Sequence, residues 1–123
     1  MILKKTEDKQ AIILNAFYKN TLIAVSNITC SERLADKHVG VFGISVAKEY
    51  RGKGVGKLLM QTIIVEAKKQ LQDLKILSIG VFADNVIAQK LYKKLGFKQY
   101  GRLPNGFDHA GTFVDHVYLY KNL

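Results

Sequence analysis

The sequence of 123 residues holds one cysteine, Cys30, and no apolar run that approaches eighteen residues. One cysteine cannot form an intrachain disulfide, so a reducing, cytoplasmic setting is expected. Without a long apolar run, no membrane-spanning helix is expected. The first ten residues, MILKKTEDKQ, carry charges of both signs and no apolar core, so no signal peptide is expected either.

Repeats, linkers and low-complexity stretches are also lacking. The length fits one domain spanning residues 1–123. Cys30 falls in a polar stretch, 30–37, that is expected to form a loop. No histidine lies within this stretch. This setting favours an incidental thiol over a nucleophile.

Both usual nucleotide-binding fingerprints, GxxxxGK[ST] and GxGxxG, are missing. The sequence instead places three glycines within five positions, 52–56, between an expected strand at 38–46 and an expected amphipathic helix at about 56–71. The first N–H groups of a helix lack intrahelical acceptors and lie at the positive end of its dipole, which suits phosphate. Three nearby side chains add positive charge: Arg51, Lys53 and Lys57.

A second motif follows about thirty residues later. The glycine loop fits R-x-x-G-x-G, and the segment 85–97 reads N-x-x-A-x-x-L-Y-x-x-x-G-F. An expected strand precedes each motif. In this order, the two motifs resemble those of the GNAT family of N-acetyltransferases, and the resemblance covers roughly Ala11 to the end of the chain.

The resemblance implies an acyltransferase that moves an acetyl group from acetyl-coenzyme A to a primary amine of a small molecule, a protein N-terminus or a lysine. The glycine loop would hold the pyrophosphate, and the end of the strand before it would pair with the pantetheine amides. Tyr92 would lie near the thioester sulfur and protonate the departing thiolate. The implied cofactor-binding residues are Ile44, Ser45, Val46, Arg51, Gly52, Lys53, Gly54, Val55, Gly56, Lys57, Asn85, Ala88 and Tyr92.

The residues themselves leave simpler roles open. Asn85 is equally suited to cap the helix that follows it, and Tyr92 lies on an apolar stripe that is typical of core packing. The reaction also needs a group that removes a proton from the acceptor. The strand at 38–46 contains no carboxylate, so His38 is the candidate base there, against the alternative of a surface histidine. Asp115, His116 and a water-mediated base are further candidates.

The expected fold is α/β, with a mixed, mainly antiparallel sheet flanked by helices. Strands are expected at 11–18, 21–29, 38–46, 75–82, 97–103 and 113–121, and helices at about 56–71 and 85–95. Lys19-Asn20 is expected to form a hairpin turn, and 104–111 is expected to be a loop. Compared with the family, the N-terminal strand and helix pair are lacking, because about ten residues precede the first hairpin.

A net charge of +9 leaves a basic nucleic-acid-binding protein as an alternative. The lysines are scattered along the chain with no basic helix, however, which favours a solvated surface. The other alternative is a module that binds coenzyme A without turnover, because the part of the family fold that binds the acceptor looks incomplete in this sequence. The expected lack of the N-terminal strand and helix pair also motivates a homodimer, since the apolar faces of 11–17 and 22–28 would otherwise meet water.

Overall fold

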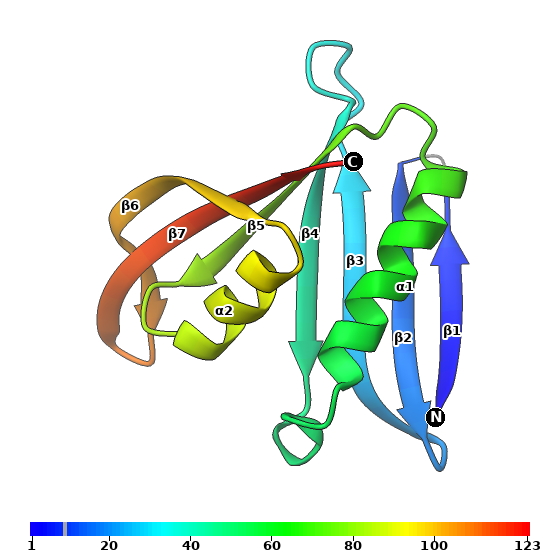
Figure 1. Cartoon of the computed structure of the whole chain (residues 1–123), viewed down its shortest axis with the longest axis horizontal. Coiled ribbons are helices and arrows are strands. Elements are labelled where there is room, and N and C mark those ends of the chain that lie inside the picture. Colours follow the sequence, from blue (N-terminus) through cyan, green and yellow to red (C-terminus); the bar gives the residue numbers. More distant parts are fainter. Residues whose placement is uncertain (9) are drawn as a thin grey trace. The chain divides into compact units, whose positions relative to one another are not determined.

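The computed structural model describes residues 1–8 and 10–123 and divides into two compact units, Met1–Lys75 and Ile76–Leu123 (Figure 1). The elements of the first unit are β1 (Ile2–Glu7), β2 (Ala11–Tyr18), β3 (Thr21–Cys30), β4 (Val39–Val46), the 3-10 turn η1 (Lys48–Tyr50) and α1 (Val55–Gln70). Its strands pair in the order β1-β2-β3-β4, and every pair is antiparallel. Lys19 and Asn20 take positive φ values of 49° and 64°, which confirms the predicted two-residue turn.

Strand β1 corrects the expectation that the N-terminal segment carries no element. It pairs with β2 along its whole length, from Ile2 opposite Phe17 to Glu7 opposite Ile12. Its charged residues hid it from a search for apolar alternation, but an edge strand needs only one paired side. Lys5 also joins it to α1 through an ion pair of 3.2 Å with Glu66. No α-helix precedes α1 in residues 1–8 and 10–54.

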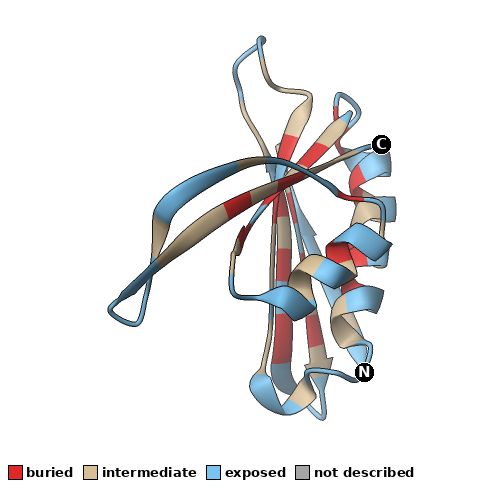
Figure 2. Ribbon diagram, turned by 60° about the vertical axis from the view of Figure 1, so that its left-hand side comes forward, coloured by how far each residue is buried: buried red, intermediate tan, exposed pale blue. Residues whose placement is uncertain are grey.

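Helix α1 packs on one face of this sheet. Its buried residues recur at helical spacing, as the sequence predicts: Leu59, Met60, Ile63 and Ala67. They meet alternate residues of the strands beneath, among them Ile12, Leu14, Ile28 and Phe42, all buried (Figure 2). Each large apolar side chain buried in this way contributes about 1.5–3 kcal/mol.

The opposite face of the same sheet is not covered by α1. The register places alternate residues there, and several large apolar side chains among them are exposed. These are Ile2, Ile13, Leu22, Val25 and Val41, with exposed fractions between 39% and 60%. This set is called the helix-free face below.

The second unit contains β5 (Ile76–Phe82), α2 (Val86–Lys94), β6 (Lys98–His109) and β7 (Thr112–Asn122). Its strands lie in the order β5-β7-β6 and are antiparallel. Alternate residues in the middle of the two paired strands are buried, namely Leu77, Ile79 and Val81 of β5 and Val117 and Leu119 of β7. Tyr92 of α2 and Phe97 just beyond it are buried as well. Gly96, with φ of 99°, ends α2 as predicted.

The predicted loop at 104–111 is wrong. Strand β6 continues to His109, and the turn consists of Ala110 and Gly111, with φ values of 53° and 89°. The turn-like residues 104–106 form a bulge instead, where the register shifts between Leu103 and Phe107. The Asp115 carboxylate stabilises this bulge by accepting from Asn105 N (2.9 Å) and Arg102 Nε (2.5 Å).

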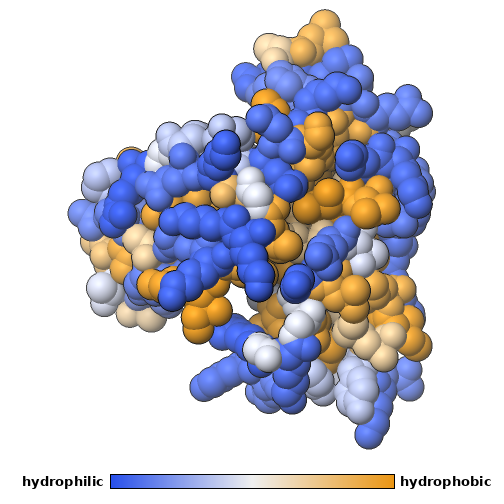
Figure 3. All heavy atoms as spheres, viewed as in Figure 1, coloured by the Kyte–Doolittle hydropathy of each residue, from blue (hydrophilic) through white to orange (hydrophobic). Residues whose placement is uncertain are grey.

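These elements confirm the α/β class with mainly antiparallel strands. Hydrophilic side chains are dispersed over the viewed faces of both units, with apolar ones between them (Figure 3), in line with the scattered lysines of the sequence. Among the described helices, none is both long enough and apolar enough to cross a membrane. No group of three or more residues suited to hold a metal ion occurs in the described parts of the chain.

Candidate functional site

The glycine loop joins the end of β4 to the start of α1. Gly52 and Gly54 have φ values of 73° and 83°, a conformation that glycine adopts without strain. A Cβ built on either residue would meet no atom within 4 Å, so the space beside the loop is open. The two glycines therefore both permit the turn and leave its backbone accessible to a ligand.

The N-terminus of α1 is not capped by any side chain. Its N-cap is Gly54, no cap hydrogen bond is made, and the first intrahelical bond runs from Leu58 N to Gly54 O (3.1 Å). The first turn contains no acidic residue, while Lys57 lies in it and Arg51 and Lys53 lie just before it, all exposed. These positive side chains lie at the positive end of the helix dipole, which is unfavourable. A bound anion would offset this positive charge and accept hydrogen bonds from the free N–H groups.

Two contacts hold the loop against β4 and its neighbours. Arg51 Nε donates to Val46 O (2.9 Å), which fixes the guanidinium beside the loop. Lys53 Nζ lies 5.7 Å from the centre of the Tyr50 ring, and that ring packs edge-on against Tyr18. The part played by Tyr50 was not foreseen, because no sequence pattern distinguishes it from a surface tyrosine.

The strand residues expected near the pantetheine lie at the end of β4. Ser26, Val25 and Ala24 of β3 stand opposite Ile44, Ser45 and Val46 respectively. The end of β4 was expected to pair with the pantetheine amides. The Val46 carbonyl already accepts a hydrogen bond from Arg51, so this group is not free to do so. The structure thus brings the β4 end, the glycine loop and the start of α1 together in the first unit.

In the second unit, α2 carries the other motif. Asn85 Oδ1 accepts from Ala88 N (3.1 Å), so the capping role of Asn85 is confirmed. Gln89, which the sequence did not single out, donates from Nε2 to Phe82 O (3.1 Å) and Ala83 O (2.9 Å). The glutamine therefore ties the helix to the end of β5.

Tyr92 is the buried residue of α2, and its ring lies 6.0 Å from that of Phe97. Burial raises the pKa of its hydroxyl, so the phenol stays protonated at neutral pH and can donate a proton. Core packing and proton donation are therefore both compatible with its position.

The candidate bases differ in their surroundings. His38 precedes β4, at the opposite end of the strand from the glycine loop, so the structure does not bring the two together. Asp115 is held by Asn105 N and Arg102, and these contacts lower the pKa of its carboxyl. His116 lies on the face of β5–β7 opposite Val117 and Leu119, and burial lowers its pKa.

A row of rings runs along that face of the second unit. Phe107 and Tyr118 stack on the His116 imidazole at 3.9 and 4.0 Å, with interplanar angles of 28° and 22°. Phe82 continues the row, edge-on to Phe107 and stacked on His109 at 4.5 Å. The sequence gives one indirect sign of this arrangement, a glycine in the middle of β5.

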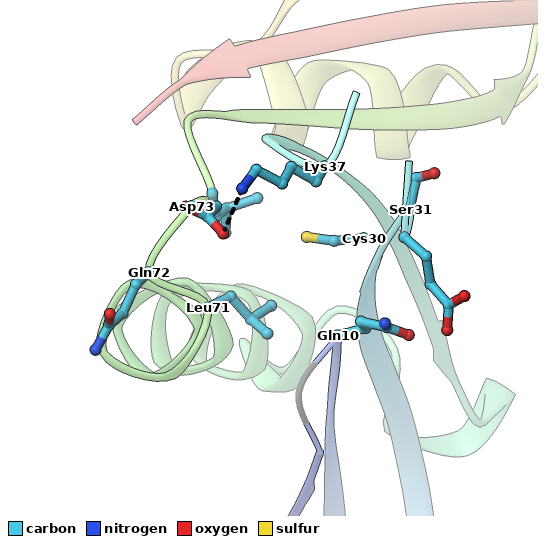
Figure 4. A pocket seen from close by; sticks show the side chains of 9 residues that line it. Gln10, Cys30, Ser31, Lys37, Leu71, Gln72 and Asp73 are labelled. Carbon is cyan, nitrogen blue, oxygen red and sulfur yellow. Dashed lines mark ion pairs between the residues drawn. The ribbon is translucent and has the colours of Figure 1, made fainter. Parts of the chain in front are cut away.

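Figure 4 shows a cavity of about 180 Å³ in the first unit, at the C-terminal end of α1. The Cys30 sulfur points into it between Leu71 and Lys37, and Lys37 forms an ion pair of 3.5 Å with Asp73. Burial and the Asp73 charge raise the pKa of the Cys30 thiol, so the thiolate is disfavoured. Cys30 is the last residue of β3 rather than part of a loop, and its environment supports an unreactive thiol.

Comparison with known proteins agrees with this geometry. The acetyltransferase (GNAT) family model matches residues 2–97. The chain is 34% identical to the L-amino acid N-acetyltransferase AaaT of Escherichia coli K12 over 92 residues, 75% of this chain and 56% of that protein. It is 29% identical to an L-methionine sulfoximine/L-methionine sulfone acetyltransferase of Pseudomonas aeruginosa PAO1, covering 65% of this chain and 45% of that protein.

Among solved structures, a GNAT-family acetyltransferase from Streptococcus pneumoniae superposes with a TM-score of 0.87 and 29% identity. The superposition covers 94% of this chain and 68% of that one. The chain thus spans about half the length of the curated relatives it matches. The match over residues 2–97, with both motifs placed on their helices, assigns this chain to the acetyltransferase (GNAT) family.

Proposed function

We propose that the chain is an N-acetyltransferase that moves an acetyl group from acetyl-coenzyme A to a primary amine. The observation that carries the proposal is the uncapped start of α1, with open space beside Gly52 and Gly54 and no acid in the first turn. A pyrophosphate fits this donor set, since free backbone N–H groups and cationic side chains converge there.

In this proposal, Arg51, Lys53 and Lys57 attract the phosphates, and backbone groups at the end of β4 hold the pantetheine arm. Tyr92 donates a proton to the leaving thiolate. Holding the thioester and the amine in one site removes the entropic cost of their encounter, which is worth about 7–11 kcal/mol. The thioester supplies the activated acetyl group, so no covalent bond to the protein is required.

The acceptor is proposed to be a primary amine of a small molecule, a protein N-terminus or a lysine. The names of the two bacterial relatives, which act on L-amino acids and on methionine derivatives, support the α-amino group of an amino acid as the first to be assayed. A single domain over 1–123 and a cytoplasmic location belong to the same proposal. The location is supported by the lone cysteine.

The experiment is a pair of measurements on the purified chain. Acetyl-coenzyme A is expected to raise the thermal midpoint while adenosine does not, because the phosphate loop must be filled; at a hundred times Kd the gain is about 2.7 kcal/mol. Turnover is then measured with a panel of amino acids and peptide N-termini. A shift without turnover of any amine would favour a coenzyme A-binding module, and a shift with RNA or DNA alone would overturn the proposal.

We also propose that the chain forms a homodimer through its helix-free face. The exposed side chains of Ile13, Leu22, Val25 and Val41 support this, because exposed apolar side chains on one face often mark an interface. A twofold partner would cover the same face on both copies.

Sedimentation equilibrium tests the dimer with a matched pair of variants. Val25→Lys places a charge on the helix-free face and is expected to give the monomer mass. Val65→Lys changes an exposed valine on α1 and is expected to leave the dimer intact. A wild-type chain that sediments as a monomer at micromolar concentration would contradict the proposal.

A further inference from the structure

Acetyl transfer to an amine needs a base, because the acceptor is an ammonium ion at neutral pH. Most carboxylates in the described part of the chain are already engaged by a cation or a backbone donor, as with Glu66, Asp73 and Asp115. Such contacts stabilise the charged carboxylate and reduce its affinity for a proton. The histidines are then the natural candidates, and one of them is held in a distinctive way.

The His116 imidazole lies directly on the backbone of β5. A Cβ built on Gly80 would fall 2.0 Å from His116 Nε2, so the ring occupies the position that a side chain at residue 80 would need. Phe107 and Tyr118 stack on the ring and fix its plane. The sequence places glycine at residue 80 for this reason, and Nε2 is thereby set against the strand.

The His116 nitrogens have no hydrogen-bond partner among the described residues and are not fully buried. In the residues that the structure describes, neither nitrogen makes a hydrogen bond, and the one fully buried side-chain nitrogen or oxygen without a partner is Asn15 Oδ1 rather than an atom of His116. The ring is half-buried. Burial lowers its pKa, so the imidazole is neutral at pH 7 and can accept a proton.

The other titratable groups near this ring are the phenol of Tyr118 and groups that have partners of their own. The phenol of Tyr118 lies beside it on β7, and beyond Phe82 the His109 imidazole pairs with Asp84 at 3.4 Å. Asp115, the neighbour on β7, pairs with Arg102 of β6. No free carboxylate therefore holds His116 in its charged form in the described structure.

We propose that His116 is the general base of the acetyl transfer, which rests on the proposed function. Nε2 takes one proton from the acceptor ammonium, and the N–H bond breaks to leave a neutral amine. The amine lone pair attacks the thioester carbonyl, a C–N bond forms and the C–S bond breaks. The thiolate takes a proton from Tyr92, the amide nitrogen loses its extra proton to restore Tyr92, and His116 releases its proton to water.

The two proton-transfer groups then lie on opposite sides of β5–β7. Tyr92 comes from α2 on the buried side, and His116 lies on the side that carries the rings. The base and the acid would thus be kept from exchanging a proton directly with each other.

The test compares His116→Gln with His109→Gln, a matched imidazole in the same row of rings. For His116→Gln we expect kcat/KM to fall 10²- to 10⁴-fold, and the acid limb of the pH profile that reports histidine deprotonation to disappear. The thermal shift with acetyl-coenzyme A should persist. His109→Gln should keep both the rate within a few fold and the limb.

Two further variants separate chemistry from packing. Gly80→Ala puts a methyl group where Nε2 lies, so the His116 ring must move, and the rate should fall although residue 116 is still histidine. His116→Ala leaves a slot between Phe107 and Tyr118, and added imidazole should restore part of its activity. Two results would overturn the inference. One is a His116→Gln enzyme that keeps the wild-type turnover and pH profile, and the other is a loss of turnover in His38→Gln instead. A wild type inactive on every amine would instead overturn the proposed function.

Discussion

The two helices of the chain begin in opposite ways. Helix α1 starts at Gly54, in a left-handed conformation, with no side chain bonded to its free N–H groups. Helix α2 starts at Asn85, whose side chain accepts from Ala88 N. One N-terminus is therefore open to an external acceptor, and the other supplies an acceptor of its own.

This difference separates two ways of contributing to a site. Around α1 the available groups are backbone N–H donors, which need glycine and the absence of side chains. On α2 the available group is a side chain, the Tyr92 hydroxyl, and the helix start serves the fold. Substitutions at the two helices should consequently fail in different ways, and the following experiments exploit that.

The largest effect is expected for Tyr92→Phe. If α2 acts through this hydroxyl, turnover should fall about 10²- to 10⁴-fold, because the thiolate then leaves without a proton donor. The Kd of acetyl-coenzyme A should stay within a few fold of wild type. Steady-state kinetics with isothermal titration calorimetry measures both. Unchanged turnover with a lowered thermal midpoint would place Tyr92 in the core alone.

An aspartate at each N-cap gives a paired test. Gly54→Asp puts a side chain and a negative charge where the pyrophosphate is proposed to lie, and the stabilisation of about 2.7 kcal/mol at a hundred times Kd should be lost. Asn85→Asp keeps a capping oxygen on α2 and should retain that shift. Differential scanning fluorimetry with and without acetyl-coenzyme A measures the pair. An equal shift in both variants would remove the phosphate role of the loop.

Removing the α2 cap should affect the fold rather than binding. Asn85→Ala leaves Ala88 N without its acceptor, and the free energy of unfolding should fall by about 0.5–2 kcal/mol. Urea denaturation measures the loss, and calorimetry should give an unchanged Kd for acetyl-coenzyme A. A tenfold or greater rise in Kd would show that Asn85 contacts the co-substrate as well.

The smallest effects concern the lysines at the two ends of α1. Lys57 opposes the helix dipole at the N-terminus, so Lys57→Gln should stabilise the free protein by about 0.3–1 kcal/mol and weaken acetyl-coenzyme A binding. Lys68 lies in the last turn, where the dipole favours a cation, so Lys68→Gln should destabilise by a similar amount and leave binding unchanged. Changes of the same sign in unfolding free energy would contradict this account.

Much of the fold could be predicted from the sequence, because local patterns determined it. The helical spacing of Leu59, Ile63 and Ala67 defined α1, and Lys19-Asn20 defined a hairpin. The errors lie where tertiary contacts decide the structure. The strand at Ile2–Glu7 depends on pairing with β2, and the continuation of β6 through its bulge depends on Asp115 and Arg102.

The candidate site shows the same division. The glycine loop and the Asn85 cap follow from residues close in sequence, and the structure places them as expected. The placement of His116 against Gly80 joins residues 36 positions apart, and no local pattern encodes it. Its single trace, a glycine inside a buried strand, indicates a close approach but not the partner.

The lone thiol at the end of β3 gives the first unit a built-in reporter. Because the Cys30 sulfur faces the cavity between Leu71 and Lys37, the rate at which a bulky thiol reagent labels it should depend on how closely the end of α1 packs there. The labelling rate would then report local opening of that helix end, and its variation with acetyl-coenzyme A concentration would reveal whether filling the far end of α1 rigidifies the whole helix.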